Sequence, residues 1–124
     1  MSLTEDITDA NYSITGYKPN CVLINHKPYS ESLIICPHTL ITSWDVTNIE
    51  QLDKTRLADI FDLEPEVVLF GTGEHLILPN PKILVLFSKY NIGIETMSTY
   101  AVCRTYGILT SEGRRTVAAF IFAK

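Results

Sequence analysis

The sequence predicts an α/β protein: a compact three-layer domain with a central mixed β-sheet and an antiparallel N-terminal meander. Three observations indicate this fold class. Residues 67–70 (Val-Val-Leu-Phe) are four β-prone apolar residues in a row, which is typical of a strand buried on both faces. Segments with helical periodicity lie on either side of this run. The first third of the chain contains short apolar runs separated by turn residues, which is the pattern of antiparallel strands.

Length and composition indicate one folded domain. The chain has 124 residues, of which 46 % are hydrophobic and 19 % are charged. No repeat, low-complexity tract or linker divides it, so we expect a single domain over residues 1–124. The longest apolar run, residues 83–87, is too short to span a bilayer, and the first residues form neither a signal peptide nor a transit peptide. We therefore expect a soluble, cytoplasmic protein without a membrane span.

Charge and cysteine content exclude several classes of function. The net charge of −4 would repel nucleic acid, and only Arg114 and Arg115 are adjacent basic residues, so we expect no nucleic-acid partner. Cys21, Cys36 and Cys103 are too few and too scattered for a disulfide framework or a zinc site, which favours a reducing compartment. The three histidines also lie apart. We therefore predict no metal site and no cofactor.

The N-terminal third predicts the meander. Residues 11–17 alternate between apolar and polar side chains, and residues 21–24 form a short apolar run that turn-forming residues follow. Residues 32–36 form another β-rich run, which a proline ends. We expect these three strands to pair with one another. A further strand is predicted within residues 40–45.

A short helix is predicted between residues 47 and 61. Residues 47–50 (Thr-Asn-Ile-Glu) have the form of a capping box, in which a hydroxyl is followed three positions later by a glutamate. Leu57, Ile60 and Phe61 then repeat with the spacing of one helix face.

The apolar run at residues 83–87 would suit either a strand or a buried helix. Asn80 and Pro81 precede it and offer an N-cap and a proline at the first helical position, which favours a helix. A helix here would also supply a right-handed crossover between parallel strands at residues 67–70 and 94–97.

The last part of the chain predicts a helix and a buried strand. Ser98 or Thr99 caps the helix, and Cys103 and Arg104 lie on opposite flanks of its apolar stripe. Residues 116–123 are apolar on both faces, so we expect them to form a central strand. At 100° per residue, the stripe covers about 160° of the helix and consists of Ala101, Val102, Thr105, Tyr106, Ile108 and Leu109.

A candidate ligand site follows the two predicted parallel strands. Gly71, Thr72 and Gly73 come after the first strand, and Ser98 and Thr99 come after the second. Ligands of open α/β sheets bind outside the carboxyl ends of such strands, where backbone N–H groups and helix N-termini converge. An anionic or carbonyl-bearing small molecule could bind there. The alternative interpretation is a tight strand exit without a ligand, because neither a dinucleotide fingerprint nor a phosphate loop is complete.

Cys103 is a candidate nucleophile because Arg104 beside it would favour the thiolate. Against this role, no histidine is near in sequence, and adjacent helix residues point about 100° apart, so a packing role is the alternative. Arg104 could clamp a carboxylate of a ligand, or pair with Glu95 or Glu112. Residues 74–75 (Glu-His) could serve acid–base chemistry or form a solvated loop. We assign no catalytic residue.

Several segments resemble one known family. Residues 69–73 (Leu-Phe-Gly-Thr-Gly), 91–97 (Asn-Ile-Gly-Ile-Glu-Thr-Met), 101–109 (Ala-Val-Cys-Arg-Thr-Tyr-Gly-Ile-Leu) and 112–115 (Glu-Gly-Arg-Arg) carry the resemblance. It is the domain-of-unknown-function family that includes mitochondrial respiratory complex I (NADH dehydrogenase) assembly factor three and many prokaryotic hypothetical proteins. The resemblance implies a three-layer α/β domain without established enzymatic activity. Its mitochondrial member acts in assembly by protein–protein contact, associated with the inner membrane.

The same resemblance defines the full candidate pocket. The family's Gly-Thr-Gly loop and Cys-Arg-Thr segment fall on two stretches of this chain and are carried over as a pocket only. With the residues at the helix start, the predicted pocket consists of Gly71, Thr72, Gly73, Ser98, Thr99, Cys103, Arg104 and Thr105.

Three functions are compatible with these observations. The first is a non-enzymatic protein-interaction or assembly factor, whose protein partner would contact an exposed apolar patch or a sheet edge. The second is a small-molecule binding protein or enzyme that uses the candidate pocket. The third is a structural homo-oligomer, for which the apolar residues 120–122 could supply contacts. We adopt the first as the working hypothesis and favour the absence of enzymatic activity.

Overall fold

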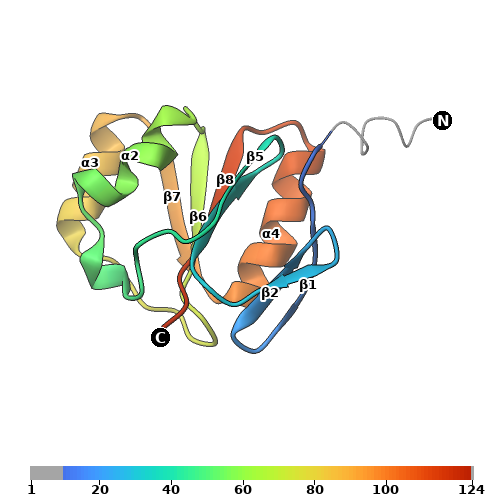
Figure 1. Ribbon diagram of the computed structural model, residues 1–124. Helices are drawn as coiled ribbons and strands as arrows, with labels where there is room; N and C mark the ends of the chain where they lie inside the picture. Colours follow the sequence, from blue (N-terminus) through green and yellow to red (C-terminus); the bar gives the residue numbers. More distant parts are fainter. Residues whose placement is uncertain (1–9, 124) are drawn as a thin grey trace.

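The computed structural model describes residues 10–123, which form two β-sheets and three α-helices in a layered arrangement (Figure 1). The strands are β1 (Ile14–Lys18), β2 (Cys21–Ile24), β3 (Lys27–Tyr29), β4 (Leu33–Cys36), β5 (Thr39–Ile41), β6 (Val67–Gly71), β7 (Gly93–Met97) and β8 (Thr116–Phe120). The helices are the short 3-10 helix η1 (Ile49–Gln51) and the α-helices α2 (Lys54–Asp62), α3 (Pro81–Lys89) and α4 (Thr99–Ser111).

The larger sheet has five strands in the order β5-β4-β8-β6-β7. Strand β6 runs parallel to both β7 and β8, whereas β4 runs antiparallel to both β5 and β8. All five residues of β6 and all five of β8 are buried, because these strands have neighbours on both sides and layers on both faces. The predictions of a central mixed sheet and of a central last strand are confirmed.

Alternation along the central strands divides the core into two halves. Val68 and Phe70 face the layer of α2 and α3, where Phe70 meets Phe87 with ring centroids 5.9 Å apart. Val67 and Leu69 face the opposite layer, which α4 and the smaller sheet form (Figure 1). The three layers of the predicted fold class are therefore α2 and α3, the larger sheet, and α4 with the smaller sheet.

Polar caps begin the three α-helices. The side chains of Asp53, Asn80 and Ser98 accept hydrogen bonds from backbone N–H groups in the first turns of α2, α3 and α4, respectively. Each such cap contributes about 1 kcal/mol to helix stability. The ambiguous run at residues 83–87 lies inside α3, so the prediction of a helix there is confirmed.

The composition of the N-terminal meander differs from the expectation. Strands β1, β2 and β3 form the antiparallel meander, but β4, predicted as a member of it, belongs to the larger sheet. Leu33, Ile34 and Ile35 have no exposed surface, which requires cover on both faces of their strand. The partner strand β8 comes from the far end of the chain, with Ile34 opposite Ala119. The cover on one face includes Val22 and Ile24 of β2, whereas residues that follow β5, such as Trp44, contribute to the other face.

Two predictions for the middle of the chain were wrong in position: the end of a strand and the place of the capping box. The strand predicted at residues 40–45 ends at Ile41, because Ser43 adopts a φ of 58° and interrupts the extended backbone. The capping box lies one residue later than predicted. Asn48 accepts from the Glu50 N–H, while the Gln51 side chain accepts from the Asn48 N–H, so the amide pair replaces the predicted Thr47–Glu50 pair.

The buried face of α4 is displaced from the predicted stripe. Val102 and Tyr106 are buried and Cys103 packs beside them, whereas Ile108 is 55 % exposed. Ile108 lies on the margin of the predicted arc, and no layer of the described structure covers that margin. Among residues 10–123, no helix is both long enough and apolar enough to cross a membrane.

Candidate functional site

The carboxyl ends of the parallel strands β6 and β7 lie side by side at one end of the larger sheet. The Thr72 backbone N–H donates to the carbonyl of Met97 at 3.0 Å, and the Thr99 N–H donates to the carbonyl of Gly73 at 2.8 Å. These two bonds hold the loop after β6 against the first turn of α4. The structure therefore brings the Gly-Thr-Gly loop and the helix start together.

The two glycines of this loop serve different purposes. A Cβ on Gly71 would lie 3.0 Å from the ring of Phe120 and 3.3 Å from a methyl group of Val102, so the core occupies the space beside Gly71. Gly73 has a φ of 91°, which L-residues with a side chain rarely adopt, and nothing lies within 4 Å of its missing Cβ. Gly71 is required for packing and Gly73 for the turn.

A hollow of about 190 Å³ lies beside Gly73. Gly73, Ser98 and Thr99 line it, and they are the members of the predicted pocket that this hollow brings together. The other lining residues come from the end of β1, from the turn between β1 and β2, and from the flanks of the two predicted segments: Tyr17, Lys18, Pro19, Asn20, Glu74 and Tyr100.

Sequence reasoning missed the contribution of the turn between β1 and β2. The rings of Tyr17 and Tyr100 lie 5.0 Å apart, which joins this turn to the start of α4. Pro19 and Asn20 were a signal for a turn, and Asn20 indeed adopts a positive φ of 63°. Nothing local in the sequence indicates that this turn lies beside a helix that begins about 80 residues later.

The first turn of α4 has few free donors for an anion. The Thr99 N–H is bound to Gly73, and the Ala101 N–H donates to the Ser98 hydroxyl at 3.3 Å. The Thr99 hydroxyl is buried and makes no hydrogen bond within residues 10–123. Lys18 and Glu74 bring one charge of each sign to the lining. Such a hollow suits a small neutral or zwitterionic group better than a phosphate.

Cys103, Arg104 and Thr105 lie further along α4 and do not line this hollow. Cys103 is half-buried and packs against the core beneath α4. Burial raises the pKa of its thiol to about 11, so the thiol is protonated at neutral pH and is a poor nucleophile. Arg104 donates to the hydroxyl of Tyr100 at 2.9 Å, and its guanidinium lies 5.6 Å from the centre of that ring. The side chain of Arg104 thus lies along the helix.

Neither Glu95 nor Glu112, the two predicted acidic partners of Arg104, forms an ion pair with it. The ion pairs of the described chain leave out Arg104, Glu95 and Glu112. Glu74 and His75 are exposed in the loop after β6. Within residues 10–123, no group of three or more metal-ligating side chains lies close enough together to hold an ion.

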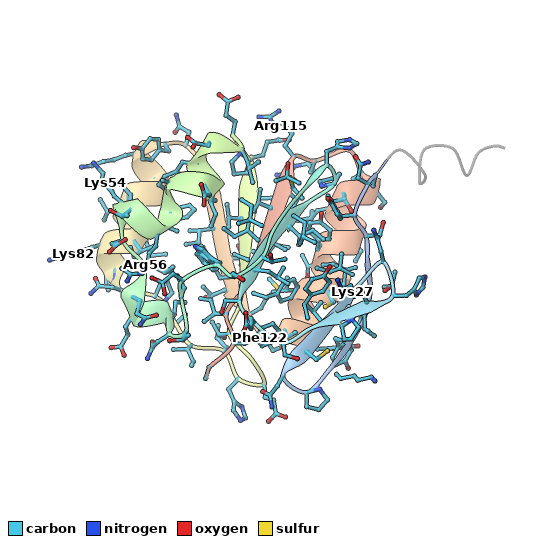
Figure 2. All side chains as sticks on the ribbon, in the orientation of Figure 1. Lys27, Lys54, Arg56, Lys82, Arg115 and Phe122 are labelled. Carbon is cyan, nitrogen blue, oxygen red and sulfur yellow. The ribbon has the colours of Figure 1, made fainter. Side chains whose placement is uncertain are left out.

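Arg114 and Arg115 lie at the opposite end of the central strands, just before β8 begins. Figure 2 shows Arg115 at one end of the molecule and Phe122 toward the other. Arg114 and Arg115 approach Glu66 at 3.5 and 3.8 Å, respectively. The Arg115 backbone N–H, bound to Glu66 at 2.9 Å, and then the two guanidinium groups lower the pKa of this carboxyl. These residues link the starts of β6 and β8.

Three consecutive apolar residues are exposed in the loop between Gly73 and α3. Leu76, Ile77 and Leu78, which we term the apolar loop, are 55, 52 and 72 % exposed. The Thr72 hydroxyl holds this loop, because it donates to the His75 carbonyl at 2.6 Å and accepts from the Ile77 N–H at 3.1 Å. The apolar loop is therefore an ordered surface feature.

The comparison with protein families identifies the chain. A family model described as "Protein of unknown function (DUF498/DUF598)" matches residues 14–121. The chain belongs to this family. The match spans every strand and helix of the described structure, and it confirms the resemblance found in the sequence.

The chain is similar to proteins of bacteria and of animals. A "13 kDa major membrane protein" of Francisella tularensis is 28 % identical, over 92 % of this chain and 94 % of that protein. The human protein named "NADH dehydrogenase [ubiquinone] 1 alpha subcomplex assembly factor 3" is 27 % identical over 96 % of this chain. The alignment spans 65 % of the human protein's length.

A solved structure has the same fold. A protein of Xanthomonas campestris, determined by NMR, is 32 % identical and superposes with a TM-score of 0.84. The superposition covers 98 % of this chain and 92 % of that chain. That protein therefore shares the mixed α/β architecture of this chain.

Proposed function

We propose that this protein is a non-enzymatic protein-interaction factor that acts in the assembly of a larger complex. The apolar loop carries this proposal. Leu76, Ile77 and Leu78 are adjacent large aliphatic residues that are each more than half exposed. A contiguous exposed apolar patch of this kind is typical of an interaction site. Burying them against a partner removes apolar surface from water and favours association.

The order of the apolar loop supports the same function. The Thr72 hydroxyl holds the middle of the loop, Pro79 is buried behind it, and Asn80 caps the helix that follows. A loop ordered before binding loses little conformational entropy when a partner covers it. An ordered apolar loop is therefore better suited to binding a partner than an apolar segment without fixed structure.

The relatives support an assembly role in particular. Several relatives are named as assembly factors of NADH dehydrogenase, and their alignments cover most of this chain. We extend this role to the present chain, with a subunit of a respiratory complex as the expected type of partner. The three free thiols fit the reducing cytoplasmic compartment that we propose for it.

A matched pair of variants tests the proposal. Ile77 and Ile108 are similarly exposed, at 52 and 55 %, but only Ile77 belongs to the apolar loop. Tagged wild-type chain, Ile77→Ser and Ile108→Ser are expressed in the native cells, and captured proteins are quantified by mass spectrometry. We expect a defined partner on the wild type and on Ile108→Ser, and about tenfold less of it on Ile77→Ser. Equal capture by both variants would contradict the proposal.

The hollow beside Gly73 supports a second candidate, a small-molecule binding protein. Gly73, Ser98 and Thr99 converge there with Lys18 and Glu74. Of the anionic and carbonyl-bearing ligands predicted for the pocket, the small number of free donors favours a neutral or zwitterionic carbonyl compound. Mass spectrometry of the supernatant after denaturing purified protein tests this candidate. A stoichiometric small molecule from the wild type, but not from Gly73→Leu, would favour it over the assembly role.

A further inference from the structure

The larger sheet ends at β7, which has a hydrogen-bonded neighbour on one side only (Figure 1). Two bonds show which residues of β7 face that neighbour. The Gly93 N–H donates to Glu66 at 2.8 Å, and the Met97 carbonyl accepts from Thr72 at 3.0 Å. The N–H and C=O groups of one strand residue point to the same side, and successive residues alternate. Gly93, Glu95 and Met97 therefore face β6.

The backbone groups of Ile94 and Thr96 consequently face outward. Their two N–H and two C=O groups form no hydrogen bond with any other part of residues 10–123. The Ile92 N–H, which points in the same direction, is already bound to the Phe87 carbonyl at 3.1 Å. The outer side of β7, which we term the β7 edge, is thus an open template for one more strand.

We propose that the β7 edge binds an extended segment of a partner protein as a sixth strand of the sheet, with a lysine or arginine opposite Glu95. The inference rests on the proposed function, since it names the conformation and charge of the partner. Backbone hydrogen bonds to Ile94 and Thr96 would hold the segment in register, and side chains of the partner would alternate between the two faces.

Charge argues for a basic partner and against a second copy of this chain. Glu95 is exposed at the middle of the five-residue strand and forms no ion pair with a described residue. Antiparallel pairing of two β7 edges about a two-fold axis would place the two Glu95 side chains opposite or diagonal to each other. Like charges at such positions destabilise a pair of strands, whereas a cation opposite Glu95 stabilises it.

The β7 edge also leads to the apolar loop. Thr72 joins them, because its N–H binds Met97 at the end of β7 and its hydroxyl binds the Ile77 N–H. We expect a segment that continues past the carboxyl end of the β7 edge to come near the exposed side chains of the apolar loop. One partner segment can use backbone pairing and apolar burial together.

A peptide pair tests the proposal on the purified full-length chain. The first probe is acetyl-Thr-Val-Lys-Val-Thr-amide, and the second has glutamate in place of lysine. Binding is followed by NMR, as hydrogen-exchange protection and chemical-shift changes at the Ile94 and Thr96 amides. We expect protection of these two amides, and binding of the lysine peptide about threefold to tenfold tighter than binding of the glutamate peptide.

Two variants of Thr96 separate edge pairing from other modes of binding. Thr96→Pro removes the outward N–H but no bond to β6, and proline is tolerated at such edge positions. Thr96→Val keeps the N–H with nearly the same side-chain shape. We expect Thr96→Pro to keep its fold by circular dichroism and to lose about tenfold or more in affinity for the lysine peptide, while Thr96→Val binds like the wild type.

Three results would overturn the proposal: no protection at Ile94 and Thr96, equal binding of both peptides, or unchanged binding by Thr96→Pro. Self-association of the wild type that Thr96→Pro abolishes would also overturn it and assign the β7 edge to a second copy. The assembly role is judged separately. If a partner is captured through Ile77 but the peptides fail, the edge proposal falls and the proposed function stands.

Discussion

The Thr72 hydroxyl accepts a hydrogen bond from the backbone N–H of Ile77 at 3.1 Å. One small side chain at the end of a central strand thereby determines the position of an exposed apolar loop. The same hydroxyl donates to the His75 carbonyl at 2.6 Å, so the loop between them is closed like a short turn. This relationship connects the buried sheet to the surface where we propose that a partner binds.

Replacing Thr72 should release the loop. Thr72→Val keeps the shape of the side chain but removes the hydroxyl that bonds to His75 and Ile77, and each of these hydrogen bonds is worth about 1 kcal/mol. We expect hydrogen exchange of the Ile77 amide to accelerate about tenfold or more, with little change at the core amides of β6. Thr72→Ser, which keeps the hydroxyl, is the control. An unchanged exchange rate at Ile77 in Thr72→Val would show that other contacts order the loop.

Adding one methyl group at Gly71 should destabilise the core. A Cβ there would lie 3.0 Å from Phe120 and 3.3 Å from Val102, so Gly71→Ala requires the core to shift. We expect a loss of about 1–3 kcal/mol in the free energy of unfolding, measured by urea denaturation. Gly107→Ala is the matched control, because nothing lies within 4 Å of that position in α4. The control should be neutral or stabilising by up to about 1 kcal/mol.

Removing the cap of α4 should weaken that helix. Ser98→Ala removes the hydroxyl that accepts from the Ala101 N–H at 3.3 Å. We expect a loss of about 0.5–2 kcal/mol, seen as a lower melting temperature. Ser98→Asp can accept the same bond and places a negative charge at the positive end of the helix, so it should recover most of the loss. Equal melting temperatures for the alanine and aspartate variants would contradict a capping role.

Cys103 should react slowly with iodoacetamide at neutral pH. Burial raises the pKa of its thiol from 9.0 to about 11, which lowers the thiolate fraction about 100-fold relative to an unburied thiol. Alkylation, resolved by peptide mass spectrometry, should therefore accelerate as the pH rises through about 11. A rate at pH 7.5 equal to that of an unstructured cysteine peptide would contradict this account.

The same shift sets the direction of a pH dependence of stability. The Cys103 thiol ionises at lower pH in the unfolded chain than in the folded chain, and burial also raises the pKa of the Tyr106 phenol. The stability that the protonated thiol maintains is complete below pH 9 and is lost as the pH rises towards about 11. Urea denaturation at pH 8 and pH 10.5 should therefore give a lower free energy of unfolding at the higher pH. A Cys103→Ala variant should show a smaller decrease than the wild type.

Short-range patterns determined much of the fold. Four apolar residues at 67–70 predicted the strand that is buried on both faces, and Asn80 and Ser98 predicted the starts of two helices. These features follow from interactions among residues within a few positions of one another, such as side chains that satisfy the first N–H groups of a helix. The glycine loop and the start of α4 were expected side by side for another reason, because the carboxyl ends of two parallel strands joined by a crossover helix lie at the same end of a sheet.

Only the tertiary structure decided the features that depend on distant partners. Strand β4 pairs with β8 across more than 80 residues, and the turn at Pro19 lies beside a helix that begins at Thr99. Sequence periodicity indicates which residues share an apolar face. The packing of all the layers decides which strand lies at the edge of a sheet and which apolar residues remain exposed. The open β7 edge and the exposed apolar loop are both consequences of that packing.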